Sequence, residues 1–311
     1  MTDPALRVEG LTRRFGATVA VDALSFSVDR AELFGLVGPD GAGKTTTLRM
    51  LAGVMRPDAG EIVMLGVRVT QEPERIRSRV AYMSQRFGLY TDLTVMENLE
   101  FYADLFRVPR AERAARRERL FRFSGLDPFR DRLAGHLSGG MKQKLGLSCA
   151  LIHQPDVLLL DEPTFGVDPI SRRDLWLIVH EMVGHGTTVV VSTAYMDEAE
   201  RFDRVAFLDR GRLLALETPE RLRRDLPGEL LAVRVARVRE ARAAAVALPE
   251  VRRAAVFGDR LHLSVASAER DGPAVTAALA RAGFPVLELT AIEPSMEDVF
   301  IERIAGRGSS A

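Results

Sequence analysis

The chain has 311 residues, of which 47% are hydrophobic, so it can form one large domain or two domains with buried cores. Its 43 Lys and Arg balance its 43 Asp and Glu, which argues against a uniformly basic surface for nucleic acid. The single cysteine, Cys149, excludes an intrachain disulfide framework, and no apolar run reaches the roughly 18–20 residues needed to span a bilayer.

The N-terminal residues indicate an antiparallel pair of strands. MTDPALRVEG has neither the basic nor the apolar region of a secretion signal, so we expect no such signal. Leu6–Val8 and Leu24–Val28 then alternate apolar and polar residues. Gly16 and Asp22 supply turn chemistry between them, so we expect the chain to reverse there.

A glycine-rich loop follows the next predicted strand. Leu33–Val37 is a short apolar run that leads directly into GPDGAGKT, and a helix is predicted over Thr45–Leu51. Strand, glycine loop and helix in this order are the context of a P-loop, whose backbone N–H groups and helix dipole hold phosphate. Lys44 is predicted to reach the β- and γ-phosphates and Thr45 to hold Mg²⁺. The residues predicted to surround the phosphates are Gly38, Pro39, Asp40, Gly41, Ala42, Gly43, Lys44, Thr45 and Thr46.

The middle of the chain carries a second candidate anion site. The pattern becomes helical and highly charged over Val95–Phe123, which is typical of a solvated helix face. In LSGGMKQ, Ser138 is a hydroxyl N-cap, and Gly139 and Gly140 leave the following N–H groups open. A chain that already has a P-loop does not need this second site for its own phosphate.

Buried strands alternate with helices in the next segment. Val157–Leu160 is continuously apolar and ends in Asp161-Glu162, as a strand buried on both faces of a parallel sheet would. Thr187–Ser192 and, more weakly, Val205–Leu208 repeat that pattern, and Arg172–Met182 reads as a helix between them. The order predicts an α/β sheet with crossover helices.

The sequence pattern changes near Asp225–Gly228, where a second domain is predicted to begin. The order of strands and helices fits a small α+β domain of the split βαβ type, and the tail over 306–311 is predicted to be disordered. The predicted elements are strands at Leu230–Val235, Val251–Phe257, Leu261–Val265 and Val286–Leu289, and helices at Glu240–Leu248 and Pro273–Ala282.

The P-loop, LSGGMKQ and LLLDEP ending at Pro163, in this order, resemble the ATP-binding cassette family of motor ATPases. The resemblance covers roughly residues 6–217, and the closing PSMEDVFIERI resembles drug exporter ATPases of the daunorubicin type. It implies a P-loop NTPase cassette over residues 1–225, with a mixed or parallel sheet and a helical subdomain at about 87–153. An accessory or dimerisation domain is expected over 229–305.

The resemblance also implies roles for single residues. Phe15 is expected to stack on adenine, and Asp168 belongs to the ATP-binding set. Asp161 is expected to hold Mg²⁺ together with Thr45 and Gln85. Glu162 is expected to polarise the attacking water, and Gln85 to sense the γ-phosphate beside it. ATP and Mg²⁺ are thus the expected ligands.

In the family, two cassettes meet head to tail, so Ser138, Gly139 and Gly140 are expected to clamp a nucleotide bound by the partner cassette. This chain departs from the family pattern at Ala194, where a histidine that contacts the γ-phosphate is usual, and at Phe165, where serine is common. The loss of one charge-assisted contact, worth roughly 1.5–3 kcal/mol, would slow hydrolysis at this chain's own P-loop about ten- to a hundredfold. That asymmetry resembles the first cassette of fused two-cassette multidrug exporter ATPases.

The leading expectation is the ATP-hydrolysing subunit of a bacterial exporter, for multidrug or other small-molecule efflux. It would lie in the cytoplasm at the inner face of the membrane, with separate transmembrane permease subunits and a second cassette as partners and no nucleic acid. A homodimer and a heterodimer both remain open. The alternatives are a regulatory cassette with little turnover, and a soluble cassette ATPase that acts on nucleic acid or ribosomes.

Overall fold

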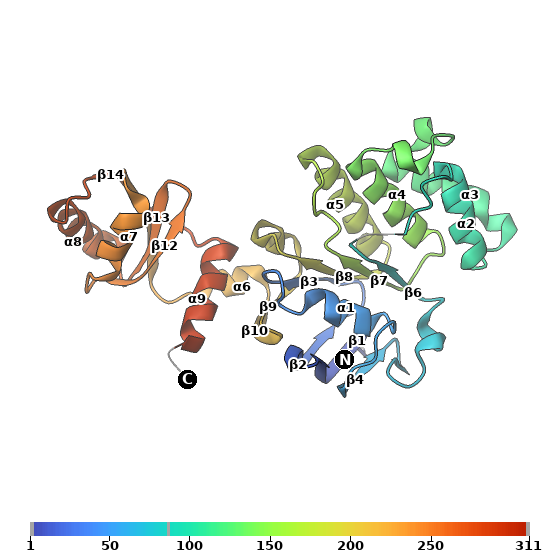
Figure 1. The fold of residues 1–311 in the computed structure, drawn as a ribbon, viewed down its shortest axis with the longest axis horizontal. Coiled ribbons are helices and arrows are strands. Elements are labelled where there is room, and N and C mark those ends of the chain that lie inside the picture. The colour runs from blue at the N-terminus through green and yellow to red at the C-terminus, as the bar shows by residue number, and fades with distance from the viewer. Residues whose placement is uncertain (1–2, 86–87, 309–311) are drawn as a thin grey trace. The chain divides into compact units, whose positions relative to one another are not determined.

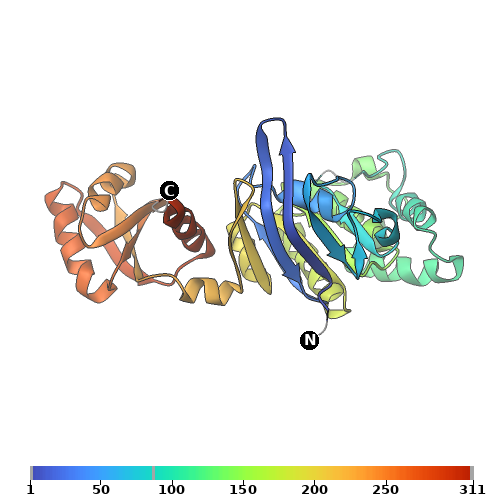
Figure 2. The same ribbon diagram turned by 90° about the horizontal axis from the view of Figure 1, so that it is seen from below.

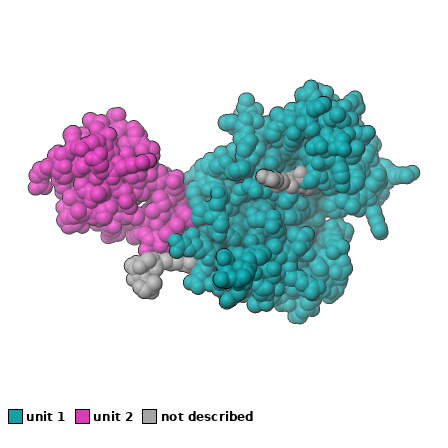
Figure 3. Space-filling model, in the orientation of Figure 1, with its two compact units in different colours: residues 1–218 teal, residues 219–311 magenta. Residues whose placement is uncertain are grey.

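A computed structural model describes residues 3–85 and 88–308 of the chain. The chain divides into two compact units, Met1–Thr218 and Pro219–Ala311 (Figure 3). Within residues 3–85 and 88–308 we find no helix with the length and hydropathy of a transmembrane span.

The first unit is organised around a six-stranded sheet of order β10-β9-β3-β8-β7-β6 (Figure 1). Its neighbours pair in parallel except β10, which is antiparallel to β9. Every residue of β3, β7 and β8 is buried, which confirms for β7 and β8 the prediction of parallel strands covered on both faces. The strands are β3 (Leu33–Val37), β6 (Val80–Met83), β7 (Val157–Asp161), β8 (Thr188–Thr193), β9 (Arg204–Asp209) and β10 (Arg212–Glu217).

A second, antiparallel sheet of order β2-β1-β4-β5 belongs to the same unit. Figure 2 shows β1 and β2 as a long hairpin, and both strands extend well beyond the predicted segments. Gly16 lies in the turn of this hairpin with φ +57°. The prediction for Asp22 was wrong, because it lies inside β2, where strand pairing continues across irregular register. The strands are β1 (Leu6–Phe15), β2 (Thr18–Val28), β4 (Ala59–Met64) and β5 (Val67–Arg68).

The charged segment that was predicted to be helical forms two separate helices. Thr94 and Glu97 form a capping box that starts α2 (Val95–Leu105), and Pro109 precedes α3 (Arg110–Ser124). The proline ring disfavours the helical conformation of the residue before it, so the helix is interrupted there. The other helices of this unit are α1 (Lys44–Leu51), α4 (Gly139–Leu151) and α5 (Pro169–Gly184), with short 3₁₀ turns η1 (Pro73–Ile76), η2 (Asp127–Phe129), η3 (Ala134–His136) and η4 (Met196–Arg201).

The second unit has the predicted βαββαβ order, with one further helix before it and one after it. Its antiparallel sheet has the order β12-β13-β11-β14. β13 lies between β12 and β11, and β11 lies between β13 and β14, so each half of the unit places one strand between the two strands of the other half. The elements are α6 (Pro219–Arg224), β11 (Glu229–Val235), α7 (Val238–Val246), β12 (Val251–Phe257), β13 (Arg260–Val265), α8 (Ala268–Arg281), β14 (Val286–Ile292) and α9 (Met296–Gly308).

The closing PSMEDVFIERI segment forms α9 and attaches it to the sheet. Ser295 and Asp298 form reciprocal hydrogen bonds at the start of the helix, and Asp298 also accepts a hydrogen bond from Nδ1 of His262 in β13 at 2.8 Å. Burial raises the pKa of Asp298, but the hydrogen bonds from His262 and Ser295 outweigh it and leave that pKa below its usual value. The helix continues to Gly308, beyond the predicted start of the disordered tail at Gly306, and residues 309–311 lie outside the described part.

Candidate functional site

The glycine-rich loop and the residues around it enclose a cavity of about 560 Å³. The loop joins the buried strand β3 to α1, so the N-terminus of α1 opens into the cavity beside the carboxyl ends of the parallel strands. This is the edge at which ligands bind in open α/β sheets. The residues that line the cavity are Phe15, Thr18, Val19, Ala20, Asp40, Gly41, Ala42, Gly43, Lys44, Thr45, Thr46, Gln85, Glu162 and Phe165.

Two glycines shape the loop for different reasons. Gly43 has φ +99°, a left-handed conformation that L-residues rarely adopt, and a Cβ there would lie 2.4 Å from the carbonyl oxygen of Ala20. Gly38 is buried against β9, where a Cβ would lie 2.2 Å from the carbonyl oxygen of Leu208. Close packing at both ends therefore holds the loop over the sheet.

Lys44 is almost completely buried at the bottom of this loop, with 4% of its surface exposed. Its ammonium group donates to the carbonyl oxygens of Gly38 at 2.7 Å and Pro39 at 3.0 Å, and lies 3.2 Å from Oε1 of Glu162. The loop backbone and one carboxylate thus fix a buried positive charge at the cavity wall. A buried cation needs such compensation, and an anionic ligand could supply it equally well.

Asp161 lies at the end of β7 and gathers three hydroxyl donors. Its Oδ1 accepts from Thr45 at 2.9 Å and from Ser192 at 2.7 Å, while Oδ2 accepts from Tyr82 at 3.2 Å. Burial and then the neighbouring Asp161 carboxylate raise the pKa of Tyr82 to about 12, so the phenol stays protonated and can donate. Tyr82 and Ser192 were not predicted from the sequence, because both belong to strands that only the sheet brings beside β7.

Glu162 follows β7 and points its carboxylate at two other predicted residues. Its φ of +49° is left-handed, a conformation that costs a non-glycine residue roughly 1–2 kcal/mol. The backbone N–H donates to Oγ of Ser192 at 3.1 Å, which helps to hold this turn. Oε2 accepts from Nε2 of Gln85 at 3.0 Å, while Oε1 faces Lys44. The two adjacent carboxylates therefore have separate sets of partners.

Aromatic side chains line the cavity away from the buried lysine. Phe15, at the end of β1, is 47% exposed, and the guanidinium of Arg13 lies 5.0 Å from its ring centre. Phe165 is 57% exposed and also lines the cavity, although the sequence marked it only as a departure from the family pattern. Exposed rings beside a cavity offer flat surfaces for a planar ligand group. Asp40 is exposed and adds a carboxylate to the lining.

The LSGGMKQ segment is not part of this cavity. Ser138 caps α4, and its hydroxyl accepts a hydrogen bond from the N–H of Met141 at 3.3 Å. Ser138 and Gly139 are both exposed. A Cβ on Gly140 would lie 2.2 Å from Oγ of Ser171 and 3.0 Å from Oδ2 of Asp168, so only glycine fits there.

Asp168 therefore lies beside the LSGGMKQ segment rather than at the P-loop. It caps α5 by accepting from the N–H groups of Ile170 at 3.1 Å and Ser171 at 3.0 Å. Hydrogen bonds from Ser171, its backbone N–H first, lower the pKa of Asp168. The structure thus separates the predicted residues into a group around the cavity and a group at the start of α4 and α5.

Ala194 follows β8 in a segment that hydrogen bonds of Thr193 and Glu198 hold in place. The carbonyl of Thr193 accepts from the N–H of Gly38 at 3.2 Å, so this segment is joined to the P-loop. The fully buried carboxylate of Glu198 accepts from Nε of Arg172 at 2.8 Å, Nε1 of Trp176 at 3.1 Å and Oγ1 of Thr193 at 2.6 Å. Ala194 itself is half-buried and is not among the residues that line the cavity.

The donor set suits a triphosphate with a divalent cation. The N-terminus of α1, the loop N–H groups and Lys44 can neutralise phosphate charge. The hydroxyl of Thr45, the carboxylate of Asp161 and the amide oxygen of Gln85 are oxygen donors of the kind that Mg²⁺ prefers. The hydrogen bond from Thr45 to Asp161 already places two of these three groups together.

Comparison with protein families gives two matches, one in each unit. Residues 21–165 match the family described as ABC transporter. Residues 218–304 match the family described as ATP-binding protein DrrA1-3-like, C-terminal domain.

Several curated proteins are similar to the chain over long alignments. A probable multidrug ABC transporter ATP-binding protein, YbhF of Escherichia coli (strain K12), is 42% identical over 314 residues; the alignment covers 100% of this chain and 54% of that protein. The chain therefore spans about half the length of this relative. The daunorubicin resistance ATP-binding protein DrrA3 of Streptomyces coeruleorubidus is 37% identical over 97% of this chain and 96% of its own length.

Solved structures of the same family share the fold. One described as the ATP-binding subunit of an ABC transporter is 33% identical, has a TM-score of 0.65, and covers 71% of this chain and 92% of its own. Another, the ADP conformation of an ATP-binding cassette of an ABC transporter, is 25% identical with a TM-score of 0.64 and covers 71% and 93%.

Proposed function

The chain belongs to the ABC transporter family of ATP-binding ATPases, with a C-terminal unit of the DrrA type, and we propose that it hydrolyses Mg–ATP to drive a small-molecule exporter. The observation that carries the proposal is the convergence on one cavity of the buried Lys44, the Thr45–Asp161 pair and the Gln85–Glu162 pair. These groups come from three separate segments of the sequence.

We expect phosphate to take over the position that Glu162 occupies beside Lys44. The ammonium group keeps its two carbonyl partners in the loop, and its third donor can turn from the carboxylate to a phosphate oxygen. Glu162 would then be free to accept a hydrogen bond from the attacking water. Gln85, bonded to its other oxygen, would hold that carboxylate in place.

Thr45, Asp161 and Gln85 would hold Mg²⁺. The bound ion would neutralise charge between the β- and γ-phosphates. Tyr82 and Ser192 would keep the Asp161 carboxylate in its orientation, since each donates to one of its oxygens. Phe15 would stack on adenine, with Arg13 packed over its ring.

The exposed Ser138 and Gly139, with the buried Gly140 behind them, would serve a second cassette. It presents a helix N-terminus and a hydroxyl cap to solvent, with Asp168 beside Gly140. Since these residues do not line the chain's own cavity, we infer that they clamp ATP bound by a partner cassette. The proposal leaves open whether that partner is another copy of this chain or a different cassette.

The exporter role rests on the relatives. Two of them are named for multidrug transport and daunorubicin resistance, and the longer one is almost twice the length of this chain. We therefore propose membrane permease subunits and a second cassette as partners at the inner face of the membrane. We propose residues 1–225 as the cassette and 229–305 as an accessory unit for dimerisation or docking.

A regulatory cassette with little turnover is the second candidate. Ala194 favours it, because alanine cannot supply the charge-assisted contact to the γ-phosphate that the family's histidine makes. The buried Lys44 and the aligned Glu162 favour hydrolysis. Steady-state phosphate release from the purified chain separates the two.

Binding of a fluorescent ATP analogue to Lys44→Ala tests the nucleotide site. Loss of a charge-assisted bond worth roughly 1.5–3 kcal/mol should weaken binding about ten- to a hundredfold. Arg30→Ala, which removes an exposed cation outside the cavity, is the matched control and should bind normally. Equal affinities of Lys44→Ala and the wild type would reject the assignment.

Glu162→Gln tests hydrolysis and closure together. The neutral amide retains the shape of the side chain but polarises water weakly, so the variant should bind ATP and form a stable dimer with ATP and Mg²⁺. Sedimentation of the variant with and without nucleotide measures this. A variant that binds ATP and stays monomeric would rule out closure between two copies of this chain.

A further inference from the structure

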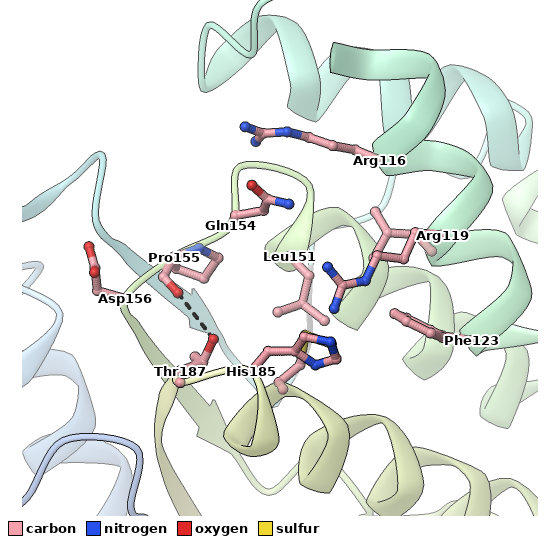
Figure 4. A pocket seen from close by; sticks show the side chains of 12 residues that line it. Arg116, Arg119, Phe123, Leu151, Gln154, Pro155, Asp156, His185 and Thr187 are labelled. Carbon is pink, nitrogen blue, oxygen red and sulfur yellow. Dashed lines mark hydrogen bonds between the residues drawn. The ribbon is translucent and has the colours of Figure 1, made fainter.

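A second cavity, of about 340 Å³, lies in the first unit between α3, the end of α4 and the turn from α5 to β8 (Figure 4). Its volume falls within the range of small-molecule sites, roughly 300–1,000 Å³. None of its lining residues belongs to the nucleotide cavity.

The two cavities lie at opposite ends of the strands of the parallel sheet. Asp156, which lines the second cavity, comes directly before β7, and Asp161 at the other end of β7 belongs to the nucleotide site. Five strand residues at about 3.3 Å each separate the two by roughly 16 Å. A ligand in the second cavity would therefore not contact bound ATP.

The floor of the second cavity is apolar. Leu120, Leu151 and Met182 are buried beneath it, and Phe123 contributes an aromatic ring. Methionine sulfur and aromatic rings both pack favourably against an aromatic ligand.

One positive charge in this cavity has no compensating carboxylate among the described residues. Arg119 stacks over the Phe123 ring at 5.2 Å, and within residues 3–85 and 88–308 no carboxylate lies within ion-pair distance of it. The other charged side chains are matched: Arg116 pairs with Glu112, and Asp156 pairs with Arg79 at 2.8 Å. Figure 4 shows the Arg119 guanidinium turned toward Leu151 and His185.

We propose that this cavity binds a small aryl carboxylate, with its ring on the apolar floor and its carboxylate on Arg119. Guanidinium matches a carboxylate through two parallel hydrogen bonds, and the low polarity of the floor strengthens that pairing. A neutral aromatic ligand would gain the floor contacts only.

Calorimetric titration of the full chain with 1-naphthoate and its neutral analogue 1-naphthamide tests the proposal. The ligand efficiency of small molecules predicts a dissociation constant of about 1 mM or lower for naphthoate. Naphthamide should bind at least about tenfold more weakly, and Arg119→Gln should weaken naphthoate binding by a similar factor. Arg122→Gln, which removes an exposed cation of α3 outside the cavity, should leave binding unchanged.

Two further titrations test whether naphthoate binds in the nucleotide cavity instead. Lys44→Ala should bind naphthoate as the wild type does, and saturating Mg–ATP should not compete. Equal affinities for naphthoate and naphthamide, an unaffected Arg119→Gln variant, competition by ATP, or no saturable binding would each overturn the proposal.

Discussion

Glu198→Gln should destabilise the first unit strongly, although Glu198 does not line the nucleotide cavity. Its carboxylate is fully buried and accepts from Arg172, Trp176 and Thr193. Removing one partner of a buried ion pair costs about 3–5 kcal/mol. Arg172 is a quarter exposed and keeps Asp197 at 2.9 Å, so we expect a smaller loss of about 3 kcal/mol.

Calorimetric unfolding measures this loss as a shift of the midpoint temperature. For a domain of about 200 residues, a loss of about 3 kcal/mol corresponds to roughly 6–12 °C. Asp197→Asn is the matched control: its side chain is 71% exposed, and an exposed ion pair contributes at most about 1 kcal/mol. If Glu198→Gln unfolds within about 2 °C of the Asp197→Asn control, the buried network does not stabilise the unit as argued.

Four further outcomes follow from the same structure. Ala194→His should raise steady-state phosphate release by about tenfold or more if the missing contact limits the rate; an unchanged rate would end that explanation. Burial lowers the pKa of His153 to about 4, so the unfolded chain binds a proton below pH 6.5 that the folded chain excludes. Stability should therefore fall by up to about 3 kcal/mol as the pH drops from 6.5 to 4, and urea unfolding of His153→Phe should show a smaller loss. Burial also raises the pKa of Cys149, so its thiol should react with a disulfide reagent only after unfolding; rapid labelling of the native chain would contradict this. Truncation after Thr218 should leave ATP affinity within about twofold of the full chain, because the cavity residues all belong to the first unit; a larger loss would place part of the site in the second unit.

Local patterns predicted most elements of the fold. The apolar runs at β3, β7 and β8 are buried along their whole length, as expected for parallel strands. The helical pattern over Val95–Phe123 is confirmed, and Pro109 divides it into α2 and α3. The turn assigned to Asp22 failed because pairing with β1 extends β2 through it.

The candidate site was predictable where its residues are contiguous. The loop from Gly38 to Thr45 carries its own conformational requirements, so glycine and lysine at fixed spacing indicate a phosphate cradle directly. The partners of Asp161 were not predictable, because Tyr82 and Ser192 are ordinary strand residues until β6 and β8 pair beside β7.

The residue pattern was enough to predict that a buried strand, a glycine loop and a helix would meet a paired carboxylate at the end of another strand. Those features depend on backbone conformation and on neighbouring residues, which the chain encodes locally. The packing of distant segments, by contrast, places Asp168 beside Gly140 rather than at the P-loop, and leaves Arg119 without a carboxylate partner among the described residues. These outcomes depend on which distant segments pack together, since a side chain's charge balance and contacts are set by neighbours in space.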